Sequence, residues 1–321
     1  MDQEENAKIT SSFESLSRES KELYLHSCVS ETEVEPTALQ FMKKCVSPNL
    51  PLIIREGCKY WPATSKWSHE YLRSVIGNKF VTVAVTPNGY ADAIREGQFV
   101  LPEERKIKFS DFLDIIENPD KTNGVYYVQK QDSSLVKEFQ EIAEDVPKEI
   151  VFASLALEKK PDAINFWMGD KRAVTSMHKD PFENIYGVIK GHKDFILIPP
   201  TDLPWIPYKT VPQAVYKETT GQFEIVSLED SDPIPWIDID PLNPDVEKYP
   251  KFKNAHMLRC RVHAGDLLYL PSMWFHHVRQ TQGCIAVNYW YDMDYDIKYA
   301  YYTMLETLCT GKPPEDYIEP L

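Results

Sequence analysis

The chain has 321 residues, and its 35 Lys and Arg against 49 Asp and Glu leave a formal net charge of −14 at pH 7. An acidic surface argues against non-specific nucleic-acid binding and favours a cationic partner, such as a peptide rich in Lys and Arg. No apolar run approaches the roughly 18 residues that cross a bilayer, and the first residues lack the basic-then-apolar pattern of a signal peptide. A hydrophobic content of 43% supplies a core and excludes global disorder. The sequence therefore predicts a soluble protein of the cytosol that binds neither membranes nor nucleic acid.

The N-terminal segment, residues 1–50, is predicted to be helical. Apolar residues recur at mostly helical spacing from Phe13 to Leu25, and Pro36 then opens a second helix. Cys45 lies in this second helix. None of the six cysteines forms a C-x-x-C pair or a zinc-site spacing, so we expect buried, reduced thiols. The sequence leaves open whether Cys45 forms a disulfide that links two subunits.

Residues 51–295 are predicted to form one core domain of short strands separated by turns. Its first part mixes strands at 52–55, 80–85 and 126–128 with helices at 71–76 and 109–116, the second helix having Ser110 as its N-cap. From there on strands follow one another, at 163–168, 175–178, 184–189, 195–198, 259–262, 267–270, 275–278 and 285–290. A helix over 297–308 is predicted within the C-terminal segment, 296–321.

Residues 201–258 interrupt this series of strands. They are rich in Pro and acidic residues, and their apolar residues show no sustained period. This composition predicts a long irregular insertion and not a separate domain. Many short strands with helices at both ends predict a fold that is mainly β with flanking α-helices, a sandwich or a barrel.

The most informative segment is His178-Lys179-Asp180. Side chains two apart on a strand point to the same face, so the imidazole and the carboxylate can reach one metal ion. With 8 His in the chain, composition gives about one such motif by chance, so the motif needs a third ligand. His276, which follows an apolar strand and turn, would complete a triad of two His and one carboxylate. That triad leaves positions open on Fe(II) for a bidentate cosubstrate and O₂.

These motifs together resemble the Jumonji-C (cupin-fold) Fe(II)- and 2-oxoglutarate-dependent oxygenases over roughly residues 35–295. The segment 175–180 looks like the family's T-x-x-H-x-D strand, residues 265–276 resemble the strand with the distal ligand, and residues 288–290 resemble the N-x-W close of the barrel. The resemblance implies a double-stranded β-helix, a jelly-roll barrel of the cupin type.

Either His276 or His277 could be the distal ligand by type, but neighbours on a strand point to opposite faces and only one can face the interior. The family places its ligand five residues beyond a proline, which is Pro271 here. The resemblance therefore selects His276 and leaves His277 facing outward or supporting the ligands.

A dicarboxylate buried in a barrel needs a cation and hydrogen-bond donors. Lys193 lies fifteen residues after His178, and it matches the lysine that binds the distal carboxylate of 2-oxoglutarate in this family. The resemblance implies further contacts to 2-oxoglutarate from Tyr127, Thr175, Asn184 and Asn288. The remaining histidines at 192, 256 and 263 are interpreted as structural.

The resemblance extends to a group of small family members that hydroxylate lysyl residues at C3 in developmentally regulated GTP-binding proteins. It implies oxidation of a protein lysine coupled to decarboxylation of 2-oxoglutarate to succinate and CO₂. It also implies a homodimer through the terminal helices and a cytoplasmic location with a nuclear presence. Asp92 is a candidate anchor for the substrate ammonium group, with an ordinary turn aspartate as the alternative. Tyr186 shares a strand face with Asn184 and is a second substrate candidate.

Three alternatives remain. A metal-dependent endopeptidase that cuts histone tails near methylated arginine would use metal-bound water. The sequence has no H-E-x-x-H motif, and a peptidase would not need Lys193 and Thr175 as residues that bind 2-oxoglutarate. Histone demethylation has less support, because no reader domain or zinc cluster accompanies the motifs. A non-enzymatic cupin-fold binding module would not need all three metal ligands.

Overall fold

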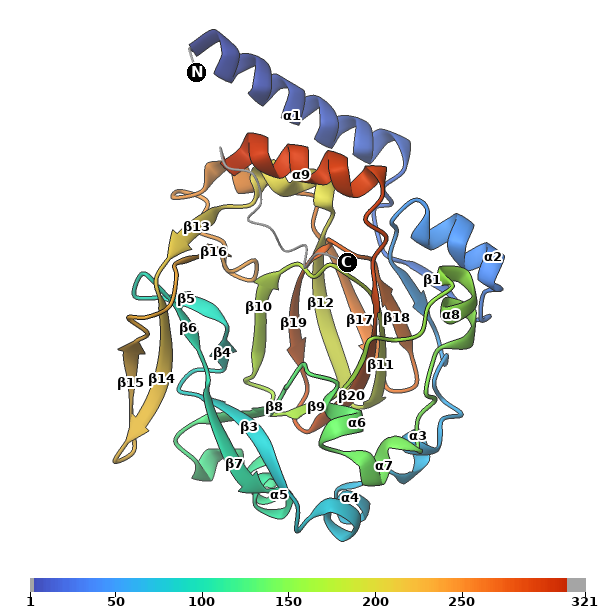
Figure 1. The fold of residues 1–321 in the computed structure, drawn as a ribbon, viewed down its shortest axis with the longest axis vertical. Helices are drawn as coiled ribbons and strands as arrows, with labels where there is room; N and C mark the ends of the chain where they lie inside the picture. Colours follow the sequence, from blue (N-terminus) through green and yellow to red (C-terminus); the bar gives the residue numbers. More distant parts are fainter. Residues whose placement is uncertain (1–2, 311–321) are drawn as a thin grey trace.

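The computed structural model describes residues 3–310 of the chain. Two sheets face each other across its centre (Figure 1), and the predicted class, mainly β with helices at both ends, is confirmed. The larger sheet has the order β1 (Ser30–Thr32), β2 (Leu52–Ile54), β18 (Leu267–Leu270), β11 (Phe182–Lys190), β20 (Cys284–Asp292), β9 (Ala163–Gly169), β8 (Val125–Val128), β3 (Phe80–Thr86), β7 (Glu103–Lys108). The smaller sheet has the order β17 (Leu258–His263), β12 (His192–Ile198), β19 (Phe275–Gln280), β10 (Val174–His178), β4 (Tyr90–Ala91).

The alternation of side chains on β12 shows how the smaller sheet separates two cores. Phe195 and Leu197 pack into the core between the two sheets. Ile196 and Ile198 pack into another core on the outer face of the smaller sheet. Because successive side chains on a strand point to opposite faces, β12 is apolar on both sides. The same alternation on β19, its neighbour, decides which of two adjacent histidines faces inward.

Helices cover the outer face of the larger sheet and bury a third core, in which Phe41 and Tyr269 meet edge to face at 4.7 Å. The segments with residues in this core are α2 (Ala38–Phe41), a π-turn at Met42–Val46, α3 (Pro62–Lys66), α4 (His69–Ile76), α5 (Phe109–Glu117), α6 (Ser134–Lys137), α7 (Gln140–Ala143) and α8 (Val151–Leu157). Because these helices pack on the outer face of the larger sheet, the polar residues of the site lie between the two sheets.

Residues 201–258 are more regular than the expected irregular insertion. They contain β13 (Tyr208–Val211), β14 (Gln213–Thr219), β15 (Gln222–Ser227) and β16 (Ile234–Ile237), with short helices η3 (Pro200–Trp205) and η4 (Pro250–Asn254). β14 pairs in parallel with β6 (Gln98–Leu101), which in turn pairs with β5 (Ala93–Arg95). Strands 100 residues away in the sequence thus complete this sheet, and a local pattern cannot reveal such partners.

The two terminal helices lie together at one end of the barrel (Figure 1), with η3 in contact with both of them. α1 (Gln3–Leu23) is held by a buried hydrogen bond from Ser17 Oγ to Asp202 Oδ1 at 2.8 Å. α9 (Ile297–Thr310) matches the predicted C-terminal helix and buries Tyr302. Residues 311–321 of the predicted C-terminal segment lie outside the described residues.

Two local predictions in the helical parts were wrong. The N-terminal segment 1–50 also contains the strand β1, which pairs in parallel with β2. The N-cap of α5 is Lys108 and not Ser110. β7 ends at Lys108, so the helix begins directly with Phe109, which is fully buried. Core packing of Phe109, and not a side-chain cap, therefore sets the start of α5.

All six cysteines are free. Cys45 is buried, and burial raises the pKa of its thiol to about 11, so the structure gives no support to a link between subunits through it. Cys28 and Cys309 are exposed, contrary to the expectation of buried thiols. No helix within residues 3–310 combines the length and the apolarity needed to cross a membrane.

Candidate active site

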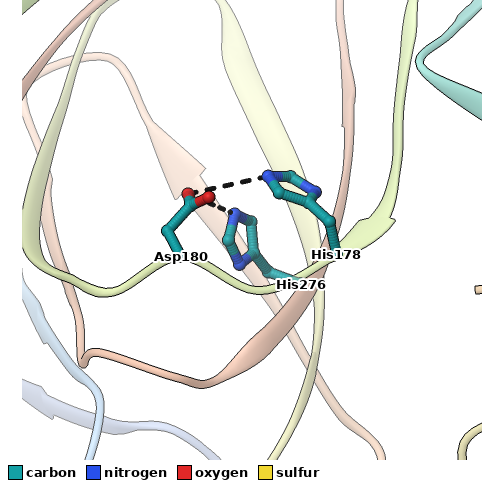
Figure 2. Close-up of side chains that lie close together, drawn as sticks. All are labelled: His178, Asp180 and His276. Atoms are coloured by element: carbon teal, nitrogen blue, oxygen red, sulfur yellow. Dashed lines mark ion pairs between the residues drawn. The ribbon is translucent and has the colours of Figure 1, made fainter. Parts of the chain in front are cut away.

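His178, Asp180 and His276 form the only cluster of potential metal ligands of its kind among the described residues. His178 ends β10 and lies directly opposite His276 of β19 in the strand register. Oδ2 of Asp180 is 3.6 Å from Nε2 of His178 and 3.5 Å from Nε2 of His276. Figure 2 shows the three side chains converging on one point. This arrangement agrees with the predicted triad.

Backbone carbonyls orient both imidazoles of the triad. Nδ1 of His178 is 2.8 Å from the carbonyl oxygen of Ser176, and Nδ1 of His276 is 3.0 Å from that of Trp274. Because a carbonyl only accepts, each Nδ1 carries the proton and donates it. Each Nε2 then keeps its lone pair and turns toward Asp180, as a metal ligand requires.

The electrostatics of the triad also suit a cation. Burial alone would raise the pKa of Asp180, but the neighbouring His178 and His276 outweigh burial and lower it to about 2. Burial, with His178 nearby, lowers the pKa of His276 to about 4. At neutral pH the triad therefore presents an ionised carboxylate and a neutral His276. Burial would lower the pKa of His178, but Asp180 outweighs burial and raises it, so a divalent metal would compete with a proton at this imidazole.

His277 lies on the opposite face of β19 from His276. It is 1% exposed, and burial lowers the pKa of its imidazole to about 4. Its Nε2 is 3.9 Å from Oδ1 of Asp240, in the 201–258 segment. His277 is thus buried beneath that segment and separated from the triad by the sheet, as the alternation of the strand predicts.

A cavity between the two sheets contains the triad and the predicted cosubstrate residues together. Its walls come from β8–β12 and β18–β20, with one residue from the loop after β8 and one, Asp180, from the link between β10 and β11. The lining residues are Tyr127, Gln131, Trp167, Thr175, His178, Asp180, Asn184, Tyr186, Lys193, Phe195, Leu270, His276, Val278, Asn288 and Trp290. All eight residues predicted to bind metal or 2-oxoglutarate line this one cavity.

Lys193 is a buried cation in this cavity, with 1% of its surface exposed. Its Nζ donates to Oη of Tyr127 at 2.8 Å and to Oε1 of Gln280 at 2.7 Å. No carboxylate of residues 3–310 forms an ion pair with it, and burial lowers its pKa to about 8. A buried ammonium group without an anion is costly, so the site is suited to a ligand that brings a carboxylate.

The other predicted cosubstrate residues lie around Lys193 and the triad. Tyr127 hydrogen-bonds to Thr175 and Tyr186. Asn288 Nδ2 donates to Asn184 Oδ1 at 3.2 Å. The ring of Tyr186 has Lys193 Nζ at 5.4 Å from its centre, so Tyr186 belongs to the lysine end of the cavity. A contact of Tyr186 with a substrate stays a prediction.

Sequence reasoning missed three residues of the site. Gln280 bonds Lys193, and its position two and four residues beyond Val278 and His276 is a readable signal, because these three share one face of β19. Trp167 Nε1 donates to Asn288 Oδ1 at 2.8 Å. Trp236 of β16 stacks on His178 with 6.3 Å between ring centres, and only the tertiary structure reveals this contact.

Asp92 lies beside the cavity and is not among its lining residues. Its carboxylate accepts a hydrogen bond from Gln129 Nε2 at 3.4 Å, and none of the described Lys or Arg side chains pairs with it. Burial raises the pKa of Asp92 to about 6, against the effect of the nearby His178. The backbone of Asp92 has φ of +53°, in agreement with a turn residue.

The three histidines interpreted as structural are remote from the triad. His192 and His263 face each other across paired strands, with 5.9 Å between ring centres. His256 Nε2 is 3.0 Å from the carbonyl oxygen of His26, which ties the loop before β17 to the chain after α1. None of the three lines the cavity.

The pKa of Lys193 predicts how binding of the expected cosubstrate, 2-oxoglutarate, would depend on pH. A dicarboxylate needs the protonated lysine, and this amine loses its proton above about pH 8 instead of 10.5. The apparent affinity should therefore fall by about tenfold for each pH unit above 8. Titrations of the metal-loaded protein by calorimetry at pH 7, 8 and 9 would measure this slope. Lys193→Arg, whose cation does not titrate in this range, is the control and should lack the slope.

Comparison with known proteins gives one domain match and three informative relatives. Residues 38–297 match the family described as a cupin-like domain. The chain is 48% identical over 289 residues to the human "Bifunctional peptidase and (3S)-lysyl hydroxylase JMJD7", covering 90% of this chain and 92% of that protein. It is 37% identical over 312 residues to "Lysine-specific demethylase JMJ32" of Arabidopsis thaliana, covering 92% and 90%. It is 38% identical over 304 residues to "JmjC domain-containing protein E" of Dictyostelium discoideum, covering 85% and 86%.

Proposed function

The chain belongs to the cupin-like family of Jumonji-C proteins, and on that premise we propose that it is an Fe(II)- and 2-oxoglutarate-dependent oxygenase that hydroxylates C3 of a lysyl residue in a protein. One observation carries the proposal. The same cavity holds the His178, Asp180 and His276 cluster and the buried, unpaired cation of Lys193. A metal ion alone would account for the triad. An anionic cosubstrate would in addition account for the buried ammonium group of Lys193.

The residues of the cavity divide into two groups by what they would bind. The two Nε2 atoms and the Asp180 carboxylate would hold Fe(II), which with 2-oxoglutarate supplies the oxidation of a C–H bond by O₂, while 2-oxoglutarate becomes succinate and CO₂. Lys193 would neutralise the distal carboxylate, and Tyr127 and Thr175 would donate hydrogen bonds to it. Asn184 and Asn288, which are hydrogen-bonded to each other, would orient the other end.

The apolar walls would protect the reaction. Phe195, Leu270 and Val278 line the cavity together with Lys193 and the triad. They exclude water, which strengthens the ion pair that Lys193 makes with its ligand. The stacked Trp236 covers His178 from the side of the 201–258 segment. We infer that this segment shapes the entrance for a substrate.

The proposed substrate is a lysine in a basic part of a protein, and a developmentally regulated GTP-binding protein is the first to test. Support comes from the name of the human relative, which includes a (3S)-lysyl hydroxylase, and from the net charge of −14, which attracts a basic segment. We further propose a homodimer through the terminal helices, a cytoplasmic and nuclear location, and a catalytic domain that covers residues 51–295.

The proposed contact of Asp92 with the substrate predicts a change in KM. Asp92→Asn removes the negative charge and keeps the shape of the side chain, so it should raise KM for a lysyl peptide several-fold. This factor corresponds to the free energy of about one exposed ion pair. The affinity for 2-oxoglutarate should not change. Steady-state kinetics with a basic peptide would measure both. An unchanged KM would identify Asp92 as an ordinary turn residue.

The decisive experiment is anaerobic loading with Fe(II) and 2-oxoglutarate, then exposure to air with a library of basic peptides, read by mass spectrometry. Hydroxylation adds one oxygen atom to an intact peptide, and replacing the target Lys by Gln should abolish it. Cleavage would favour the peptidase that the human relative's name includes. Loss of a methyl group would favour the demethylase named for the plant relative. Absence of all three products would favour a binding module.

A further inference from the structure

Two segments outside β10 position the ligands of the triad. The link between β10 and β11 contains Asp180, and the turn 271–274 between β18 and β19 leads into His276. A buried carboxylate lies where these segments meet. Glu183, the second residue of β11, is 6% exposed and does not line the cavity.

The carboxylate of Glu183 binds the turn 271–274 through Ser272. Its Oε1 accepts from Ser272 Oγ at 2.9 Å, and its Oε2 accepts from the backbone N–H of Ser272 at 3.2 Å. Oε2 also accepts from Oη of Tyr269 at 2.5 Å, on the strand just before the turn. Two of the three donors come from the turn and the third from the end of β18, so Glu183 fixes this part of the chain to the start of β11.

The turn passes this restraint to both metal-binding segments. The backbone N–H of Met273 donates to the carbonyl of Asp180 at 2.9 Å. The carbonyl of Trp274 accepts from Nδ1 of His276 at 3.0 Å, which sets the direction of its Nε2. Met273 has φ of +66°. Residues other than Gly rarely adopt this left-handed backbone conformation, and the surrounding structure must hold them in it.

A second contact holds the other side of the turn. Nδ2 of Asn49 donates to the carbonyl of Ser272 at 3.1 Å, and Nε1 of Trp274 donates to the carbonyl of Asn49 at 2.8 Å. The turn is thus held between Asn49 and Glu183, and Trp274 is 1% exposed. Such a closed set of buried hydrogen bonds makes the local backbone rigid.

We propose that Glu183 is a positioning residue for the metal centre, which keeps Asp180 and His276 at their spacing by holding the turn 271–274 against the Asp180 segment. The inference rests on the proposed metal role of the triad. It gives a role to a carboxylate that touches neither the metal position nor the cosubstrate position. If Glu183 only stabilised the fold, its replacement would not change the metal affinity.

The test uses Glu183→Gln and Co(II) as a spectroscopic probe for the metal position. The amide keeps the shape of the side chain, but its NH₂ group cannot accept a hydrogen bond from Ser272 or Tyr269. Part of the hydrogen bonding that holds the turn 271–274 is therefore lost. Loss of a group that orients a metal ligand lowers metal affinity by roughly 10–100-fold, and we expect about tenfold here. The visible absorption band of bound Co(II) should also change, because the ligand geometry relaxes.

Asp145→Asn is the matched control. Asp145 is also 6% exposed, and its carboxylate accepts from three donors, Trp67 Nε1 at 3.0 Å, Tyr71 Oη at 2.9 Å and Lys66 Nζ at 2.5 Å, none of which belongs to the triad or its turn. It should lower Tm and leave the Co(II) affinity and spectrum as in the wild type. If Glu183→Gln behaves like this control, the positioning role is wrong.

The outcome also separates this inference from the proposed function. A wild-type protein that binds no Co(II) overturns the metal assignment, and with it the role of Glu183. A wild type that binds Co(II) and a Glu183→Gln variant that binds it equally well overturn only the role of Glu183. If Glu183→Gln does not fold, Ser272→Ala, which removes one of the three donors, is measured by the same criteria.

Discussion

His276→Ala should abolish stoichiometric metal binding and all turnover, whereas His277→Ala should keep both. The triad has only three protein ligands, so losing Nε2 of His276 removes a large share of the affinity and the open facial geometry with it. His277 lies on the outer face of β19, 3.9 Å from Asp240, and cannot reach the triad through the sheet. His178→Ala and Asp180→Ala should behave like His276→Ala.

Anaerobic titration with Fe(II), followed by removal of weakly bound metal and metal analysis, would measure this difference. His277→Ala is a demanding control, because it opens a cavity in a buried position and lowers Tm without touching the site. Folding of each variant is checked by circular dichroism. Metal retained in His276→Ala and lost in His277→Ala would reverse the assignment of the distal ligand.

The second large effect is expected for Lys193→Ala. Without the cation, a carboxylate of 2-oxoglutarate would be buried unpaired, at a cost on the order of 3–5 kcal/mol. The affinity for 2-oxoglutarate should fall by roughly a hundredfold or more. Metal binding should persist, because Lys193 lies on β12 opposite Gln280 and bonds Tyr127 and Gln280, not the triad.

Calorimetric titration of the metal-loaded protein with 2-oxoglutarate would measure the loss. Lys193→Met keeps the length of the side chain and removes the charge, so it separates the effect of charge from that of an opened cavity. Tm should rise or stay level in Lys193→Met, because the buried ammonium group destabilises the free protein below about pH 8. An unchanged dependence on 2-oxoglutarate in both variants would contradict the role of Lys193.

The pair of Lys193 and Gln280 shows where sequence reasoning reached its limit. Lys193 could be predicted, because its spacing from His178 matches a family motif. Gln280 bonds its Nζ only because β12 and β19 are adjacent antiparallel strands, in which Lys193 and Gln280 are register partners. Strand pairing is a property of the whole sheet, and no local pattern states it.

The sequence by itself determined the alternation of β12 and β19 and the helices at both ends, because these follow from residue order and side-chain periodicity. The choice of His276 over His277 as the inward residue came from the resemblance to the family and not from periodicity. Only the tertiary structure decided the rest. It ordered residues 201–258 into strands through a partner at β6, placed Trp236 on His178, moved Tyr186 to the lysine end and gave Glu183 its three donors. Except for Tyr186 and Lys193, which lie on consecutive strands, these contacts join segments far apart in the sequence. The energies of all of them depend on burial and packing that exist only in the folded chain.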